Sequence, residues 1–352
     1  MRRWYVWLPI SALLLGFVIW RTRPWEIGGL WNELDRGSLL AALALNVPVV
    51  LLWAIRSRFL MEGVGHPLSV AQLVPVVSFA NTVNNLTPAS TGEVLRALVL
   101  KERYGVPYGR SAAVIVAERL WPLGIMVLTA FAAASGELLR LPGPIVALAW
   151  AGAAFLSFLP ALAYRAGLRP GRLVRRLAGP DSARSELPSP SAAAKAVLPV
   201  DPIPKTGRLA RFATALGEVD DQLAALITPA GRALGFVLST AAIFACFGLQ
   251  LWFVLLALGV SISPLAAWAV LGLALLAGIV SALPFGLGAT DAVLTLLLAT
   301  IGVEAAAAGA AALLLRATAT LPLGIAGTVS WVLLTGGARP SKTVQTGTSG
   351  PP

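Results

Sequence analysis

Residues 88–125 read PASTGEVLRALVLKERYGVPYGRSAAVIVAERLWPLGI, and residues 284–325 read PFGLGATDAVLTLLLATIGVEAAAAGAAALLLRATATLPLGI. Both contain a proline, a glycine four residues later, a Gly-Val pair, an arginine thirteen residues after that valine, and a closing Pro-Leu-Gly-Ile. The two arginines, Arg119 and Arg316, lie within otherwise apolar runs. A repeated, broken element that carries a buried charge is how many secondary transporters are built.

The composition is that of a membrane protein. Of the 352 residues, 57% are hydrophobic and 12% are charged, with a mean hydropathy of +0.80, whereas a soluble domain carries about 25% charged residues. The net charge of +11 fits cytoplasmic loops and anionic lipid headgroups, so no nucleic-acid partner is predicted. With one cysteine, Cys246, and one histidine, His66, we expect neither an internal disulfide nor a histidine-based metal site, and no cofactor.

Two kinds of apolar segment alternate along the chain. The segments 69–100 and 264–301 are interrupted by prolines and by asparagines or glycines. Non-helical backbone persists at membrane depth only where protein or trapped water satisfies it, so we predict that each forms a re-entrant pair of half-helices. The remaining long segments can each cross ~30 Å of hydrocarbon; they are 4–20, which follows Arg2 and Arg3 without a cleavage site, 39–55, 111–134, 142–164, 232–258 and 304–334.

Loop charges set the predicted orientation. The loops 56–68 and 101–110 each carry a small excess of basic residues and are therefore assigned to the cytoplasm. The predicted fold is all-α: a polytopic helix bundle of the cell membrane, over residues 1–335, with two inverted repeats at about 39–134 and 232–334. Both termini are expected in the cytoplasm. An eight-span arrangement, in which both broken elements cross fully, is the alternative.

One long loop, 165–231, separates the repeats and begins with several arginines, which place it in the cytoplasm. Residues 179–206 are rich in Pro, Ser and Ala and predict a disordered linker. Residues 207–228 carry apolar side chains at 3,4-spacing, which predicts an amphipathic helix. It lies at the membrane surface or packs against another helix of the protein. The tail 336–352 is predicted to be disordered.

Each broken element provides a helix start at membrane depth. Ser90 and Glu93 fit a capping box, and Pro88 ends any preceding helix. Unpaired N–H groups and the positive dipole end make such a start an anion site, unless the box only caps the helix. The predicted positions are Ser90, Thr91, Gly92 and Glu93 in the first copy and Gly288 and Asp291 in the second.

Charged residues within apolar helices are the other candidates: Arg96, Glu118, Arg119 and Arg316. A charge there costs about 2.5–3.5 kcal/mol even on the lenient scale, so each needs a partner or a wet cavity. The arginines either link to buried acids as structural pairs or bind an anionic ligand. Arginine suits phosphate because its planar fork bonds two oxygens at once.

Neutral polar residues mark further contacts. Asn81, Asn84 and Asn85 precede the first break and either satisfy the freed backbone or contact a polar headgroup. Asn46 and Gln250 lie singly within helices, and we expect them to hydrogen-bond between helices. The sequence has no Walker loop, no Asp-x-Asp pair, no HExxH and no Gly-x-Ser-x-Gly, which favours a function without catalysis but does not decide it.

The run N-x3-N-x2-P-x3-GE-x2-R from Asn81, followed by Gly-Val and ER-x2-P, resembles the membrane domain of lysylphosphatidylglycerol synthetase/flippase proteins. So does P-x-G-x-G-x2-D at 284–291 with Arg316 downstream, although Phe285 stands where glycine is expected and Asp291 where glutamate is expected. The resemblance implies a flippase-like fold over residues 4–335. The lysine-attaching domain of two-part members is expected to be absent.

The resemblance implies movement of an anionic phospholipid or lipid-linked headgroup between membrane leaflets. The arginines would hold phosphate, and Glu93, Glu118 and Asp291 would balance charge or accept protons. Two alternatives stay open: a membrane-embedded glycosyltransferase-like enzyme acting on a lipid carrier, and a non-transporting partner of another membrane protein. The expected partners are membrane lipids.

Overall fold

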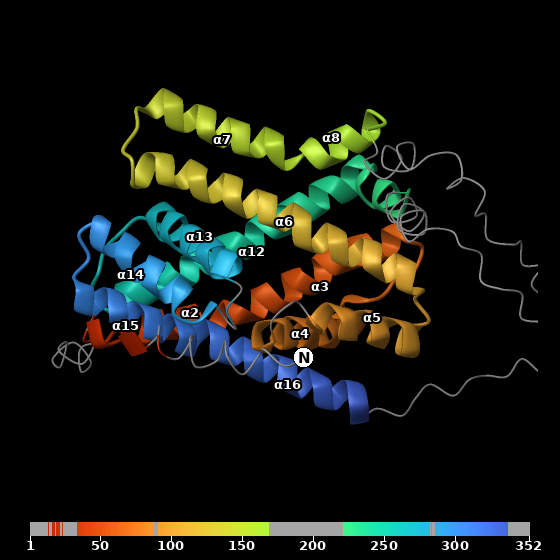
Figure 1. Cartoon of the computed structure of the whole chain (residues 1–352), viewed down its shortest axis with the longest axis horizontal. Helices are drawn as coiled ribbons and strands as arrows, with labels where there is room; N and C mark the ends of the chain where they lie inside the picture. The colour runs from red at the N-terminus through yellow and green to blue at the C-terminus, as the bar shows by residue number, and fades with distance from the viewer. Residues whose placement is uncertain are drawn as a thin grey trace, which may run out of the picture.

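The computed structural model describes residues 34–87, 91–168, 221–281, 283 and 286–336, together with scattered positions between 13 and 23. All regular structure in these ranges is helical (Figure 1). The helices are α2 (Arg36–Ala44), α3 (Asn46–Gly63), α4 (Val70–Leu86), α5 (Thr91–Tyr104), α6 (Tyr108–Glu137), α7 (Gly143–Ser157), α8 (Leu159–Arg165), α12 (Ala230–Ala257), α13 (Pro264–Ser281), α14 (Ala289–Thr300), α15 (Ala305–Leu315), the π-helical η5 (Arg316–Thr320) and α16 (Leu321–Gly336).

Several helices are long and apolar enough to cross a membrane. Among the described residues these are Arg36–Gly63, Tyr108–Glu137, Ala230–Ala257, Pro264–Ser281 and Ala305–Thr335, and α7 with α8, which meet at 45°, add one more if they form a single span. The prediction of an all-helical, multi-pass membrane protein is confirmed. The predicted first helix, 4–20, lies largely outside the described residues.

Both interrupted segments form helical hairpins, α4 with α5 and α13 with α14. The hairpins lie in opposite halves of the bundle's long axis, α4 and α5 on the right and α13 and α14 on the left of Figure 1. With 12 residues, α14 is only about 18 Å long, too short to cross ~30 Å of hydrocarbon. Helix α13, by contrast, is long enough to span by itself.

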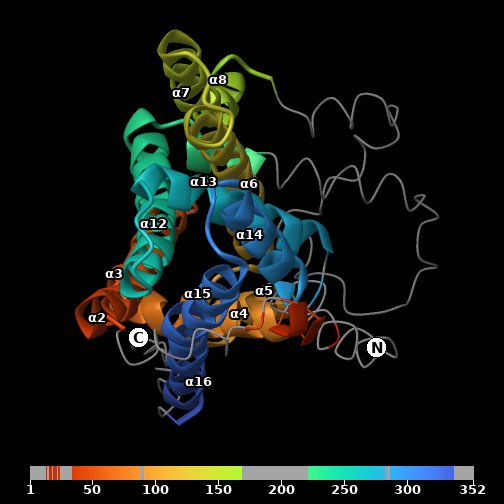
Figure 2. The ribbon, with the colours of Figure 1, turned by 90° about the vertical axis from the view of Figure 1, so that its left-hand side faces the viewer.

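Helix α12 joins the two halves, because it packs against α2 and α3 as well as α6, α13 and α15. Stacked aromatic pairs fix it: ring centroids are 4.5 Å apart in Trp121–Phe236 and 5.2 Å apart in Phe244–Trp268. Seen down the long axis, α7 and α8 form one edge and α16 the opposite edge (Figure 2). Exposed apolar side chains cover both edges, as expected of surfaces that face lipid; they include Leu148, Phe155, Ile325 and Val332.

The cytoplasmic loops predicted at 56–68 and 101–110 are shorter than expected. Helix α3 continues to Gly63, so Arg56 lies within a helix rather than in a loop. Helix α5 ends at Tyr104 and α6 begins at Tyr108, which leaves three residues between them. Basic residues near the end of an apolar segment predicted a solvent-exposed loop, but the helix continues past Arg56 and carries it into the bundle.

The predicted amphipathic helix at 207–228 is described only from residue 221. There, residues 221–227 are helical, and Leu226 and Ile227 are buried in the core between α3, α4, α6 and α12. This part packs against the protein itself. The predicted linker at 179–206 lies outside the described residues, as does the predicted tail beyond residue 336.

Candidate functional site

The first broken element places a carboxylate where α5 begins. Helix α4 ends at Leu86 and α5 begins at Thr91, so Glu93 lies in the first turn of α5. Its Oε1 accepts hydrogen bonds from Arg119 Nε at 3.0 Å, Arg119 Nη2 at 2.5 Å and Asn84 Nδ2 at 2.9 Å. Glu93 therefore ties α4, α5 and α6 together at the break.

A second, deeper pair lies one turn further along α5. Arg96 forms an ion pair with Glu118, and both side chains are at least 94% buried. Ser57 Oγ donates to Glu118 Oε1 at 2.5 Å and accepts from Arg96 Nη2 at 3.1 Å. Arg96 Nη1 also lies 3.7 Å from Glu93 Oε2. This buried network joins α3, α5 and α6.

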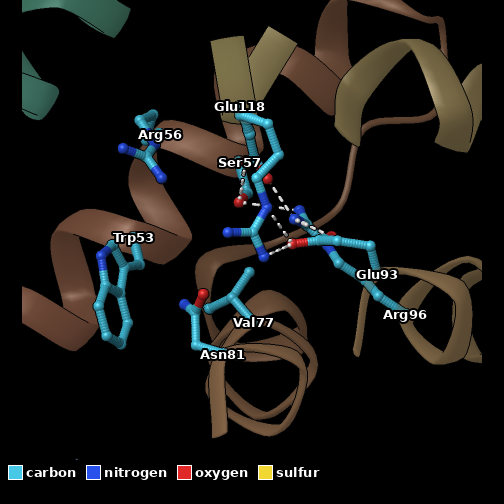
Figure 3. A pocket seen from close by; sticks show the side chains of 9 residues that line it. Trp53, Arg56, Ser57, Val77, Asn81, Glu93, Arg96 and Glu118 are labelled. Carbon is cyan, nitrogen blue, oxygen red and sulfur yellow. Dashed lines mark hydrogen bonds and ion pairs between the residues drawn. The ribbon is translucent and has the colours of Figure 1, made fainter. Parts of the chain in front are cut away.

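These groups enclose a cavity of about 50 Å³ within the bundle (Figure 3). Arg56 on α3 lies about 10 Å from the end of that helix at Gly63, below the surface of the bundle. The Arg119 side chain is 43% exposed, so the cavity opens to the outside at this residue. The full lining is Trp53, Arg56, Ser57, Val77, Asn81, Glu93, Arg96, Glu118 and Arg119.

The cavity carries more positive than negative charge: three arginines against two glutamates. Arg56 is the charge that sequence reasoning missed, because its position near a presumed loop suggested a cytoplasmic role. The available signal was its place directly after the apolar segment 39–55, in a run with no proline or glycine between Pro48 and Gly63, which favours continuation of the helix. Its neighbour Ser57, which bonds Glu118, belongs to the same face of the site.

The second broken element repeats the first ion pair. Asp291, in the first turn of α14, accepts from Arg316 Nε at 2.9 Å and Nη2 at 2.6 Å, and from the Gly288 N–H at 2.9 Å. Gly288 has no side chain to complete a capping box, and its φ of 81° suits glycine. Asp291 and Arg316 do not line the cavity of the first element, so the structure does not bring the two copies into one site.

Of the other residues predicted to form the site, some lie at the cavity and others lie away from it. Gly92 is buried against α4, and Asn81 lines the cavity. Thr91 is exposed and hydrogen-bonded to Thr87, while Asn85 is exposed and away from the cavity. Ser90 lies outside the described residues, so its part in a capping box stays a prediction.

Asn46 and Gln250 are confirmed as interhelical hydrogen-bonders. Asn46 Nδ2 donates to the Thr318 carbonyl at 2.6 Å, and Gln250 Nε2 donates to Asn46 Oδ1 at 3.2 Å. Thr318 lies in the π-helical turn η5, which begins at Arg316. Wide turns of this kind leave carbonyls that need outside donors, and Asn46 supplies one beside the second ion pair.

Two relatives are similar to parts of this chain. A UPF0104 membrane protein of Archaeoglobus fulgidus is 32% identical over 94 residues, 26% of this chain and 28% of that protein. The Glycosyltransferase AglD of Haloferax volcanii is 27% identical over 116 residues, 33% of this chain and 19% of that protein. In both matches the chain spans less than a third of the relative's length.

The family comparison covers far more of the chain. The family model described as "Lysylphosphatidylglycerol synthase TM region" matches residues 6–327. This range includes both helical hairpins, both acid–arginine pairs and the cavity. The protein thus belongs to the lysylphosphatidylglycerol synthase transmembrane-region family.

Proposed function

We propose that the protein moves an anionic phospholipid or a lipid-linked headgroup between the two leaflets of the membrane. The observation that carries the proposal is the polar cavity inside the helix bundle, where three arginines face two glutamates. A surplus of guanidinium groups at membrane depth is costly, and an anionic headgroup entering beside exposed Arg119 would balance it.

The proposal includes two inverted repeats, about 39–134 and 232–334, each with a re-entrant pair of half-helices. Three observations support it: the hairpins occupy opposite halves of the bundle (Figure 1), α14 is too short to span, and each hairpin has a first-turn acid bonded to an arginine further along. The acid and the arginine are Glu93 and Arg119 in one repeat and Asp291 and Arg316 in the other.

We place the end of the bundle that holds the α5–α6 connection, and with it both termini, in the cytoplasm. The side chains at this end are mostly basic, which agrees with the positive-inside rule. Arg103 Nη1 bonds the Leu334 carbonyl at 2.6 Å, which locates the end of α16 there as well. The basic residues concerned are Arg58, Lys101, Arg103, Arg110, Arg165 and Arg232.

We assign substrate binding to the residues of the cavity whose polar groups an entering headgroup can reach. Arg119 is bonded to Glu93 yet 43% exposed, so it can contact a headgroup that enters the cavity. Arg96 and Glu118 are bonded to each other and buried, so they stabilise the helices around the cavity. Asn81 lines the cavity from α4 and offers an amide to the headgroup.

The test is lipid movement in vesicles. Purified protein is reconstituted into vesicles that contain phosphatidylglycerol with a fluorescent label, and a membrane-impermeant quencher is added outside. An active protein lets the quencher reach label that began in the inner leaflet, so fluorescence falls well beyond the outer-leaflet half.

The matched variants are Arg119→Ala and Gly124→Ala, both on α6. Arg119→Ala removes the open guanidinium and should abolish movement. Gly124→Ala should leave it unchanged, because a Cβ at Gly124 meets nothing within 4 Å. Protein-free and wild-type vesicles that behave alike would contradict the proposed function.

A glycosyltransferase-like activity is the second candidate, because one relative carries that name. Glu93 would be its carboxylate base, at the open end of the cavity. Incubating the reconstituted protein with a lipid carrier and nucleotide-sugar donors tests it, with glycosylated lipid detected by mass spectrometry. Product that depends on Glu93 would favour this candidate over transport.

A further inference from the structure

We propose that Arg56 is the residue that holds the phosphate of the bound lipid, and that the cavity accepts one singly charged phosphodiester. This assignment rests on the proposed function and adds a specific ligand group and a specific residue to it. It follows from the charges in the cavity, the contacts of each arginine and the size of the enclosed space.

The three arginines of the cavity differ in their carboxylate partners. Arg96 is bonded to Glu118, and Arg119 is bonded to Glu93, so each of these arginines has a carboxylate. Arg56 has no bonded carboxylate: among the described residues it forms no ion pair, its buried Nε has no hydrogen-bond partner, and Glu118 attracts it only at a distance. In Figure 3 no dashed line reaches Arg56.

Arg56 lies over an aromatic ring of α12. Its guanidinium carbon lies 5.7 Å from the centroid of the Phe236 ring, a cation–π contact. Such a contact is worth much less than the partner that a cation within the membrane needs. A guanidinium with no bonded carboxylate is therefore kept at a cost in stability, which is typical of a group retained for binding.

The net charge and the volume of the cavity both match a phosphate group. Two carboxylates against three guanidinium groups leave one positive charge in the cavity, which matches the single negative charge of a phosphodiester. A volume of about 50 Å³ has room for a few waters and falls far below the ~300–1,000 Å³ of whole-ligand pockets. The cavity fits the phosphate, and the rest of the lipid stays outside it.

Binding to purified protein in detergent tests the assignment. The probes are dioleoyl phosphatidylglycerol and, separately, inorganic phosphate; the readouts are bound lipid by native mass spectrometry and the rise in melting temperature. Arg56→Gln should weaken phosphatidylglycerol binding about ten- to hundredfold. Arg56→Lys keeps the positive charge but loses the two-point hydrogen bonding of the guanidinium, so its affinity for phosphatidylglycerol should lie between those of wild type and Arg56→Gln.

The matched control is Arg58→Gln, on the same helix. Arg58 is exposed and bonded to Glu62 at 2.7 Å, so its loss should leave lipid binding unchanged. Without lipid, Arg56→Gln should melt no lower than wild type, because no carboxylate loses its partner. A purely structural Arg56 would instead lower the melting temperature in every condition.

Each possible result of these measurements either supports or overturns the assignment of Arg56. Equal phosphatidylglycerol binding by wild type and Arg56→Gln overturns the assignment, as does equal loss in Arg58→Gln. Protection by inorganic phosphate that also depends on Arg56 supports it and shows that the acyl chains are not needed. A wild type that fails to move lipid in vesicles contradicts the proposed function but leaves this assignment to the binding result.

Discussion

Gly92 lies where α5 comes closest to α4. A Cβ placed there would lie 2.7 Å from Asn84 Oδ1 and closer still to the Ala80 carbonyl oxygen. The Ala80 oxygen belongs to the backbone and cannot rotate away, so any side chain at Gly92 must push α5 from α4. This contact also sets the position of Glu93, whose carboxylate bonds Asn84.

We therefore expect Gly92→Ala to lower the free energy of unfolding by about 1–3 kcal/mol, the usual cost of overpacking. Transport should fall as well, because Glu93 moves with α5. The comparison is Gly124→Ala, where the added methyl meets nothing within 4 Å and alanine should stabilise the helix by about 0.5–1 kcal/mol. Thermal unfolding in detergent decides, and similar melting temperatures for the two variants would refute the close contact.

The Arg96–Glu118 pair gives a different expectation, because both side chains are almost fully buried. Arg96→Gln leaves the Glu118 carboxylate without its main partner and should cost about 3–5 kcal/mol. The double variant Arg96→Gln with Glu118→Gln removes both charges and should recover most of that loss. Unfolding measurements on the two single variants and the double variant complete the cycle, and losses that simply add would show that the pair is not coupled.

At the scale of elements, both hairpins contain an acid–arginine pair, but the two acids differ in their other partners. If Arg119 is removed, the Glu93 carboxylate still has two partners, Asn84 Nδ2 at 2.9 Å and Arg96 Nη1 at 3.7 Å. Among the partners that the described residues provide, Asp291, whose side chain is 3% exposed, keeps only the N–H of Gly288. The pair in the second hairpin is therefore the more dependent on its arginine.

This difference predicts that Arg316→Ala destabilises the protein more than Arg119→Ala does. Stranding buried Asp291 should cost about 3–5 kcal/mol, whereas Glu93 retains two partners and should lose less than half of that. Asp291→Asn combined with Arg316→Ala should restore stability. Melting temperatures of these variants provide the measurement; a larger loss in Arg119→Ala would reverse the argument.

The elements were easier to predict than their contacts. The helices at 111–134 and 232–258 followed from long apolar runs, and the breaks near Gly92 and Gly288 followed from proline and glycine. The partnership of Arg96 with Glu118 and Ser57 could not be predicted, because it depends on how α3, α5 and α6 cross. The inward position of Arg56 was hidden for the same reason: a sequence shows a charge near a helix end but not which neighbours surround it.

At the scale of the whole molecule, the basic side chains gather at one end of the bundle. Arg103 at the end of α5 bonds the end of α16, and Arg110 at the start of α6 bonds His66 at 2.8 Å. The opposite end carries the connection between α12 and α13 at residues 258–263. Orientation in the membrane is therefore testable with one site at each end.

We expect Glu102→Cys and Ser261→Cys to label differently when each is introduced into a Cys246→Ala background. Both residues are exposed, one at each end. In intact cells an impermeant thiol reagent should label the cysteine at 261 and not the one at 102, while opened membranes should give labelling of both. The reverse pattern would place the basic end outside.

The unmatched guanidinium in the cavity also determines how the protein meets the electric field across the membrane. Under the assignment of Arg56, an empty cavity carries one positive charge and a cavity that holds a phosphodiester carries none. Moving one elementary charge through 100 mV is worth about 2.3 kcal/mol, so voltage acts on the empty protein in proportion to the part of the field it crosses. The loaded protein is electrically silent. A negative cell interior then favours the empty cavity facing the cytoplasm.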